Sequence, residues 1–159
     1  MTINEVFFVS RQAAEALVFY PDTAVISITD PGKRLAALPV WFRQVLRLSF
    51  YDAVPGDEFI PIPIPGCFDG SMATDIHNYV KSLHDATSAC RLIVHCEEGV
   101  SRSAAVALFA AELTGARLPD RDKAFRANPW VADLLAAQVQ GMEIDIPSPP
   151  RPEKPAELD

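Results

Sequence analysis

The feature that most constrains the fold is an apolar strand, a short polar turn and an apolar helix in direct succession. Residues 91–94 have the form of a buried strand, and residues 103–113 are apolar on every side, as in a buried helix that ends at Thr114-Gly115. The turn between them therefore lies at a helix N-terminus, where backbone N–H groups lack partners and the helix dipole is positive. Such a turn is suited to binding an anion.

The rest of the chain alternates strands and helices. The sequence predicts strands at 5–9, 24–30 and 45–52, and helices at 11–18, 39–43, 71–86, 121–127 and 131–142, with Ser10 as the first cap. This order predicts one three-layer α/β domain over residues 1–143, with a mostly parallel central sheet of about four to five strands flanked by helices. Ligands bind such sheets at the carboxyl ends of the strands. The Pro-rich, charged residues 144–159 are expected to be a disordered tail.

Cys96 and Arg102 stand at the two ends of the turn, with Gly99 between them. A thiolate at a helix N-terminus beside a guanidinium is stabilised, which predicts that Cys96 is a nucleophile. The planar Arg102 side chain can hold two oxygens of a phosphoryl group and stabilise its charge during transfer. Gly99 lets the backbone approach a ligand closely. The structural alternative is a buried cysteine and a capping serine in an ordinary turn from strand to helix.

The stretch His95-Cys96-Glu97-Glu98-Gly99-Val100-Ser101-Arg102-Ser103 resembles the signature H-C-x-x-G-x-x-R-S/T of the cysteine-dependent protein tyrosine phosphatases, in particular their compact dual-specificity branch. The resemblance implies a phosphomonoester hydrolase with a phosphocysteine intermediate and without a metal or another cofactor. It implies that Cys96 attacks phosphorus, that Arg102 binds the phosphoryl oxygens, and that Ser103 hydrogen-bonds the thiolate and helps it leave. It also implies a phosphate-binding loop of Glu97, Glu98, Gly99, Val100, Ser101 and Arg102.

His95 precedes the nucleophile, and a histidine there suggests either a general base or a structural residue. Neighbouring residues of a strand point to opposite faces, so we expect His95 to order the loop from behind.

The leaving oxygen needs a proton, which the family takes from an aspartic acid on a loop after an earlier parallel strand. Residues 45–52 have the form of such a strand, so Asp52 is our candidate general acid. Asp57 and Asp69 are its competitors, and a turn residue or helix cap is the structural alternative. The Ile/Pro segment 59–65 makes the separation from Cys96 longer than is usual in the family. It is expected to be an extended surface loop that forms a wall of the cleft, or a crossover on the core.

Charge and cysteine content restrict the partners. The net charge is −7, without clustered Lys or Arg, which argues against nucleic acid and anionic membrane surfaces. There is no run of about eighteen apolar residues and no charged-then-apolar leader, so neither membrane insertion nor secretion is expected. The three cysteines suit neither a disulfide framework nor a zinc site, which favours a reducing cytoplasm. Cys67 or Cys90 could resolve an oxidised Cys96, or both could simply be buried.

The substrate is expected to be a phosphorylated protein or a small phosphomonoester, and the sequence does not predict an oligomeric state. Three alternatives to a protein phosphatase stay open. The same chemistry could act on a metabolite such as a nucleotide or sugar phosphate, or the chain could be a catalytically silent phosphate-binding module. The third is a sulfur-transfer or arsenate-reducing enzyme, which would not need Asp52.

Overall fold

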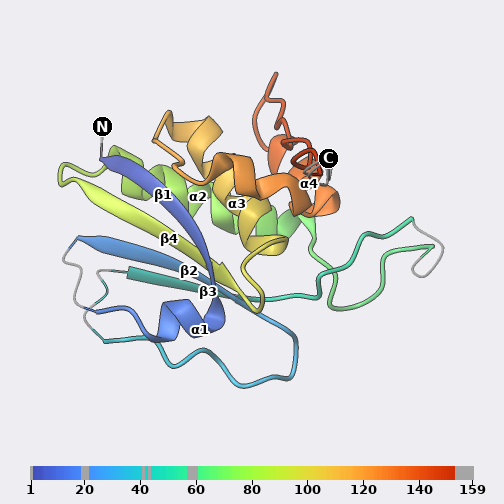
Figure 1. Cartoon of the computed structure of the whole chain (residues 1–159), viewed down its shortest axis with the longest axis horizontal. Coiled ribbons are helices and arrows are strands. Elements are labelled where there is room, and N and C mark those ends of the chain that lie inside the picture. Colours follow the sequence, from blue (N-terminus) through green and yellow to red (C-terminus); the bar gives the residue numbers. More distant parts are fainter. Residues whose placement is uncertain (1, 19–21, 41, 43, 57–60, 153–159) are drawn as a thin grey trace, which may run out of the picture.

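One parallel sheet forms the centre of the structure, a computed structural model that describes residues 2–18, 22–40, 42, 44–56 and 61–152 (Figure 1). Within these residues the sheet has four strands in the order β1-β4-β2-β3, and every neighbouring pair is parallel. The strands are β1 (Ile3–Ser10), β2 (Thr23–Thr29), β3 (Gln44–Ser49) and β4 (Cys90–Cys96). Helices flank the sheet, so the predicted α/β class with a parallel sheet is confirmed.

The two central strands, β2 and β4, are buried most completely. Every residue of β2 is buried, and so is β4 from Leu92 to Cys96. Apolar and polar residues do not alternate along a strand that is covered on both faces, because both of its faces are buried. The apolar run at residues 91–94 agrees with this position. Because all the strands run in the same direction, their carboxyl ends meet at one edge of the sheet. The loops that follow β2, β3 and β4 therefore lie at that same edge.

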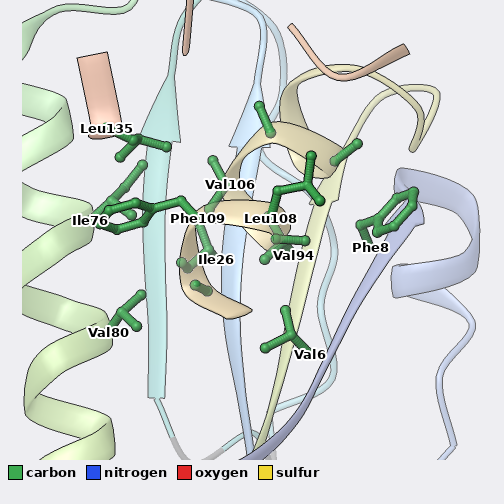
Figure 2. Close-up of a cluster of buried hydrophobic side chains, with 14 of the residues drawn as sticks. Val6, Phe8, Ile26, Ile76, Val80, Val94, Val106, Leu108, Phe109 and Leu135 are labelled. Atoms are coloured by element: carbon green, nitrogen blue, oxygen red, sulfur yellow. The ribbon is translucent and has the colours of Figure 1, made fainter. Parts of the chain in front are cut away.

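One face of the sheet carries most of the helical cover in the described part of the chain (Figure 1). Its elements are α2 (Gly70–Asp85), α3 (Arg102–Thr114), the 3-10 helix η1 (Arg121–Arg126) and α4 (Pro129–Ala136). Figure 2 shows Ile76 of α2 and Phe109 of α3 in the same buried cluster as Ile26 and Val94 of the sheet. Nearly all of α3 is buried, as its apolar sequence predicts, and the helix ends at Gly115 with a left-handed φ of 75°.

The opposite face has a thinner cover, made of the short helix α1 (Arg11–Glu15) and the segment 31–40. Ser10 caps α1 as predicted, because its hydroxyl accepts a hydrogen bond from Ala13 N at 3.1 Å. No helix occurs in residues 39, 40 and 42, and residues 41 and 43 lie outside the described part, so the helix expected over 39–43 is not found. Phe42 is instead buried in a small second core with Val25 and Ile93.

Other element boundaries also differ from the prediction, and the helix expected over 11–18 ends at Glu15. β3 ends at Ser49, so Asp52 lies in the loop after the strand rather than at its last position. The helix predicted over 131–142 begins at Pro129 and ends at Ala136. Proline suits the first turn of a helix, because the N–H that it lacks would have no intrahelical partner there.

The chain between β3 and α2 runs outward from the carboxyl edge of the sheet and returns (Figure 1). Residues 61–65 are exposed, and Tyr51 N donates to Gly66 O at 2.8 Å where the two arms of the loop meet. This segment is therefore a surface loop and not a crossover on the core. Asp57 and residues 59 and 60 lie outside the described residues.

The segment after α4 returns to the domain. Ile144 and Ile146 pack against the main core, while residues 153–159 are outside the described part. The expected tail over 144–159 thus starts with residues in contact with the domain, and the boundary at residue 143 stays a prediction. No described helix is long and apolar enough to cross a membrane.

Candidate active site

Cys96 is the last residue of β4, and its thiol is enclosed by the turn that follows. Gly99 N donates to the sulfur at 3.3 Å, and the Sγ of Cys96 lies 3.1 Å from the Oγ of Ser103. Cys96 is only 2% exposed. When the sulfur is ionised, the Ser103 hydroxyl is the donor of this pair, so both contacts then stabilise the thiolate.

The glycine of the loop is required by its backbone conformation and by the space around it. Gly99 has φ 77°, in the left-handed region that side chains rarely adopt. A Cβ atom there would collide with the backbone of Val9 and Ser10, where β1 ends and α1 begins. The loop is also attached to this junction by Arg11 N, which donates to Glu97 O at 3.2 Å. Its shape is therefore fixed by the neighbouring strand.

Arg102 is the first residue of α3, and its guanidinium is almost completely buried. Nη1 donates at 2.7 Å to Asp30 Oδ1 and at 2.7 Å to the backbone oxygen of Phe50. Nε is buried and has no hydrogen-bond partner among the described residues. A buried donor without a partner costs about 1–3 kcal/mol, more when it is charged. A bound ligand that accepted a hydrogen bond from Nε would remove this cost.

Ser101 is at the N-cap of α3 but does not cap it. Its hydroxyl makes no capping hydrogen bond and instead donates to Asp52 Oδ1 at 2.8 Å. A capping serine would satisfy one of the free N–H groups of the first turn. Because Ser101 is used elsewhere, the backbone donors at the start of α3 stay available to a ligand.

Asp52 contacts the loop that follows β4, as the sequence predicts. Its Oδ1 accepts hydrogen bonds from Ser101 Oγ and from Asn128 Nδ2, both at 2.8 Å, while the residue itself is exposed. Asp69 lies at the N-cap of α2, where its Oδ1 accepts from Met72 N at 2.9 Å. Asp57 lies outside the described residues. Of the two described candidates, only Asp52 contacts the loop.

Asp30 is a site residue that the sequence analysis missed. It follows β2, whose neighbour is β4, and its carboxylate pairs with Arg102 at 2.7 Å and with Lys33 at 3.3 Å. Burial alone would raise the pKa of Asp30, but the two cations outweigh it and hold the pKa below the ordinary value of 3.8. Asp30 is therefore ionised at neutral pH. The argument that selected Asp52, a carboxylate after a parallel strand, applies equally to Asp30.

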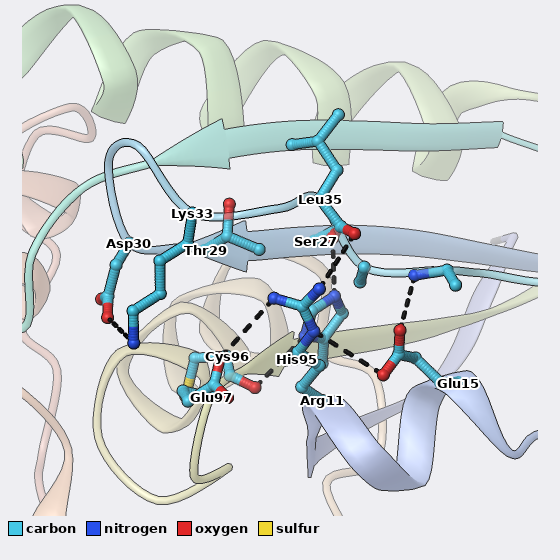
Figure 3. Close-up of polar contacts among 12 residues, drawn as sticks. Arg11, Glu15, Ser27, Thr29, Asp30, Lys33, Leu35, His95, Cys96 and Glu97 are labelled. Carbon is cyan, nitrogen blue, oxygen red and sulfur yellow. Dashed lines mark hydrogen bonds and ion pairs between the residues drawn. The ribbon is translucent and has the colours of Figure 1, made fainter.

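His95 lies behind the loop and is completely buried (Figure 3). Nδ1 is 3.2 Å from Cys96 O, and Nε2 is 2.6 Å from Ser27 Oγ on β2. Burial lowers the pKa of His95, so the ring is neutral at pH 7. A carbonyl only accepts, which assigns the proton to Nδ1 and makes Nε2 the acceptor of the Ser27 hydroxyl. Both ring nitrogens are therefore engaged with protein groups.

The two glutamates of the loop have different surroundings. The Glu97 carboxylate is 3.8 Å from Arg11 Nη1, and Arg11 Nη2 also donates to Leu35 O at 2.9 Å (Figure 3). Glu98 is exposed. Arg11 thus links the loop to the segment that follows β2. Any contact of Glu97 with a bound anion is expected through its backbone.

The cysteines differ in their distance from the site. All three are buried, and none forms a disulfide bond within the described residues. Cys90 begins β4 and Cys96 ends it, so a strand length of about 20 Å separates them at about 3.3 Å per residue. Cys90 therefore cannot resolve an oxidised Cys96. Within the described residues, no three His, Cys, Asp or Glu side chains gather in a way that could hold a metal ion.

Comparison with known protein families finds no matching family model, and a search of curated proteins finds no similar sequence. Inference about function therefore depends on the residues and on their geometry. The structure brings Cys96, Ser101, Arg102 and Ser103 together with Asp52 at one edge of the sheet. It adds Asp30 and Asn128, which the sequence did not identify as site residues.

Proposed function

We propose that this protein is a phosphomonoester hydrolase of the protein tyrosine and dual-specificity phosphatase type, which acts through a phosphocysteine. One observation carries the proposal. Three groups meet at the carboxyl edge of the sheet: a buried arginine whose Nε has no partner among the described residues, a cysteine in contact with Gly99 N and the Ser103 hydroxyl, and a carboxyl group bonded to the same loop. The resemblance of residues 95–103 to the phosphatase signature assigns them their chemistry.

The first step transfers the phosphoryl group to sulfur. The Cys96 thiolate attacks phosphorus, the S–P bond forms and the P–O bond to the leaving group breaks. Asp52 gives its proton to the leaving oxygen. Arg102 and the backbone donors of the loop hold the equatorial oxygens and stabilise their charge.

The second step is hydrolysis of the phosphocysteine. Water attacks phosphorus while Asp52 takes the proton of that water, which restores the acid. The S–P bond breaks, and Ser103 donates its hydroxyl hydrogen bond to the departing thiolate. No electron transfer occurs in either step, so the atoms and electrons of the reaction balance without a redox group or a metal.

Asp52 is the best acid among the three carboxylates on structural grounds. Asp30 is ion-paired to two cations that keep it ionised, and Asp69 is occupied in capping α2. Asp52 has both of its protein hydrogen bonds on Oδ1, which leaves Oδ2 to carry a proton. An acid bonded to the loop also favours a phosphatase over sulfur transfer or arsenate reduction, neither of which needs it.

The substrate class in this proposal is a phosphorylated protein or a small phosphomonoester. The proposed compartment is the cytoplasm, because three cysteines without a disulfide bond, one of them the nucleophile, suit a reducing environment.

Turnover of p-nitrophenyl phosphate, measured with and without EDTA, tests the proposal. We expect hydrolysis that EDTA does not reduce, and complete loss in Cys96→Ser. Vanadate binding by a protein that leaves the ester intact would instead identify a silent phosphate-binding module. A panel of phosphopeptides and metabolite phosphates then distinguishes a protein substrate from a metabolite.

A further inference from the structure

We propose that Asn128 is the positioning residue of the general acid: its amide holds Asp52 Oδ1, so that Oδ2 presents the proton to the leaving oxygen. This inference rests on the proposed function, because it assigns Asp52 the role of acid. Asn128 comes from the start of α4, far from Asp52 in the sequence, and it is only 2% exposed.

The polar groups of Asn128 all have partners that determine its orientation. Nδ2 donates to Asp52 Oδ1 at 2.8 Å and to Ala53 O at 3.0 Å. Oδ1 accepts from Val131 N at 3.1 Å, which caps α4. A carboxylate and a carbonyl can only accept and a backbone N–H can only donate, so the amide cannot be reversed. The residue therefore offers a fixed donor to the acid.

The backbone of Asn128 attaches this donor to the phosphate-binding loop. Asn128 N donates to Ser101 O at 3.1 Å, and Ser101 Oγ is the second donor to Asp52 Oδ1. Asn128 thus contacts both the acid and the loop that holds the phosphate. Asp52 lies in an exposed loop outside any strand or helix, so these two hydrogen bonds determine the direction of its carboxyl group.

Two donors on one carboxyl oxygen decide where the proton lies. A hydrogen on Oδ1 would point at the donors from Ser101 and Asn128, so the protonated acid carries its hydrogen on Oδ2. An amide also suits this position chemically. It donates at every pH and does not compete with Asp52 for a proton, as a second carboxyl group would.

The decisive variant is Asn128→Ser, since serine can still cap α4 but has no amide to hold Asp52. We expect kcat/KM for phenyl phosphate, an ester with a poor leaving group, to fall by about tenfold, which is less than the roughly 10² to 10⁴ that the acid itself supplies. Turnover of p-nitrophenyl phosphate, whose leaving group hardly needs a proton, should fall less than about threefold. A merely structural role would slow both esters equally.

Two matched variants complete the test. Asp69→Ala removes the N-cap of α2, which lies away from the loop, and so measures the effect of losing a helix cap alone. The ratio of the rates on phenyl phosphate and p-nitrophenyl phosphate should not change in this variant. The double variant Asp52→Asn, Asn128→Ser should be no slower on phenyl phosphate than Asp52→Asn alone, because both changes act on one proton transfer.

Equal slowing of both esters by Asn128→Ser, or losses that multiply in the double variant, would overturn the role of Asn128 while leaving the proposed function intact. Absence of any turnover by the unsubstituted protein would overturn the proposed function, and this inference with it.

Discussion

Asp30 holds Arg102 through an ion pair of 2.7 Å between Oδ1 and Nη1, across 72 positions of the sequence. The pair forms because β2 lies beside β4, so the residue after β2 meets the first residue of the helix that follows β4. Nη1 also donates to Phe50 O, which fixes the guanidinium from a second direction. Arg102 is thus positioned through Nη1, while its buried Nε has no hydrogen-bond partner among the described residues.

This arrangement predicts that Asp30→Ala weakens anion binding. We expect the inhibition constant for vanadate to rise about tenfold, because a charge-assisted hydrogen bond contributes about 1.5–3 kcal/mol and tenfold in affinity is about 1.4 kcal/mol. Lys33→Gln is the matched control, since it removes the other partner of Asp30 without touching Arg102. Vanadate inhibition that is unchanged in Asp30→Ala would show that the ion pair does not orient Arg102.

The same ion pair predicts a dependence of stability on pH. The pKa of Asp30 is lower in the folded protein than its ordinary value of 3.8, so the unfolded chain binds the proton more tightly. The stabilisation by Asp30 is therefore fully present above this value and is lost as the pH falls through the lower, folded pKa. The difference in denaturation midpoint between wild type and Asp30→Asn should be constant near neutral pH and should shrink below about pH 4. A difference that grows on acidification would contradict this sign.

Local sequence signals predicted the elements that carry the nucleophile. The strand over residues 91–94, the loop and the apolar helix are found as expected. A segment that is buried on all sides is apolar along its whole length, so its own sequence is enough to predict it. Asp52 was also found, although β3 stops before it.

Asp30 and Asn128 were missed for a different reason. Their roles arise from neighbours distant in the sequence: the pairing of β2 with β4, and the return of α4 to the loop. Before Pro129, Asn128 has the form of a helix cap and nothing more. Likewise, residues 39, 40 and 42 form no helix, and Phe42 is instead buried with Val25 and Ile93 of the sheet. Tertiary contacts of this kind are not encoded in any single window of sequence.

The nucleophile is tested by Cys96→Ser. We expect turnover to disappear, because a serine hydroxyl in this loop is far less ionised than a thiol. The fold should persist, since the change removes little volume from a buried position, and binding of tungstate should be retained. Circular dichroism and calorimetric titration measure the two properties. Retention of more than a few per cent of activity would exclude a phosphocysteine.

Peroxide should abolish the proposed activity reversibly, because thiolate character governs the oxidation of cysteine. Reduced thiols should restore activity, and the rate of recovery should be the same in Cys90→Ala, since Cys90 lies at the far end of β4. Cys67→Ala tests the remaining resolving partner. Slower recovery in Cys90→Ala than in wild type would contradict the separation of the two thiols along the strand.

The last prediction concerns Asp52, the acid of the proposed mechanism. The contribution of a general acid increases with the basicity of the leaving oxygen. Asp52→Asn should therefore slow the hydrolysis of phenyl phosphate or a phosphotyrosine peptide by roughly 10² to 10⁴. An ester of a more acidic phenol, such as p-nitrophenyl phosphate, should be slowed much less. Asn at position 52 can still accept from Ser101, so the loop is expected to keep its shape.

The pH profile gives an independent reading of the same variant. A mechanism that needs an ionised nucleophile and a protonated general acid loses activity at low pH and again at high pH. Asp52→Asn should therefore lose the basic limb and keep the acidic one. Asp69→Asn is the control, because asparagine is an equally good helix cap and Asp69 does not contact the loop. A basic limb that survives in Asp52→Asn but disappears in Asp69→Asn or Asp57→Asn would assign the acid to that other residue and leave the chemistry of Cys96 and Arg102 unchanged.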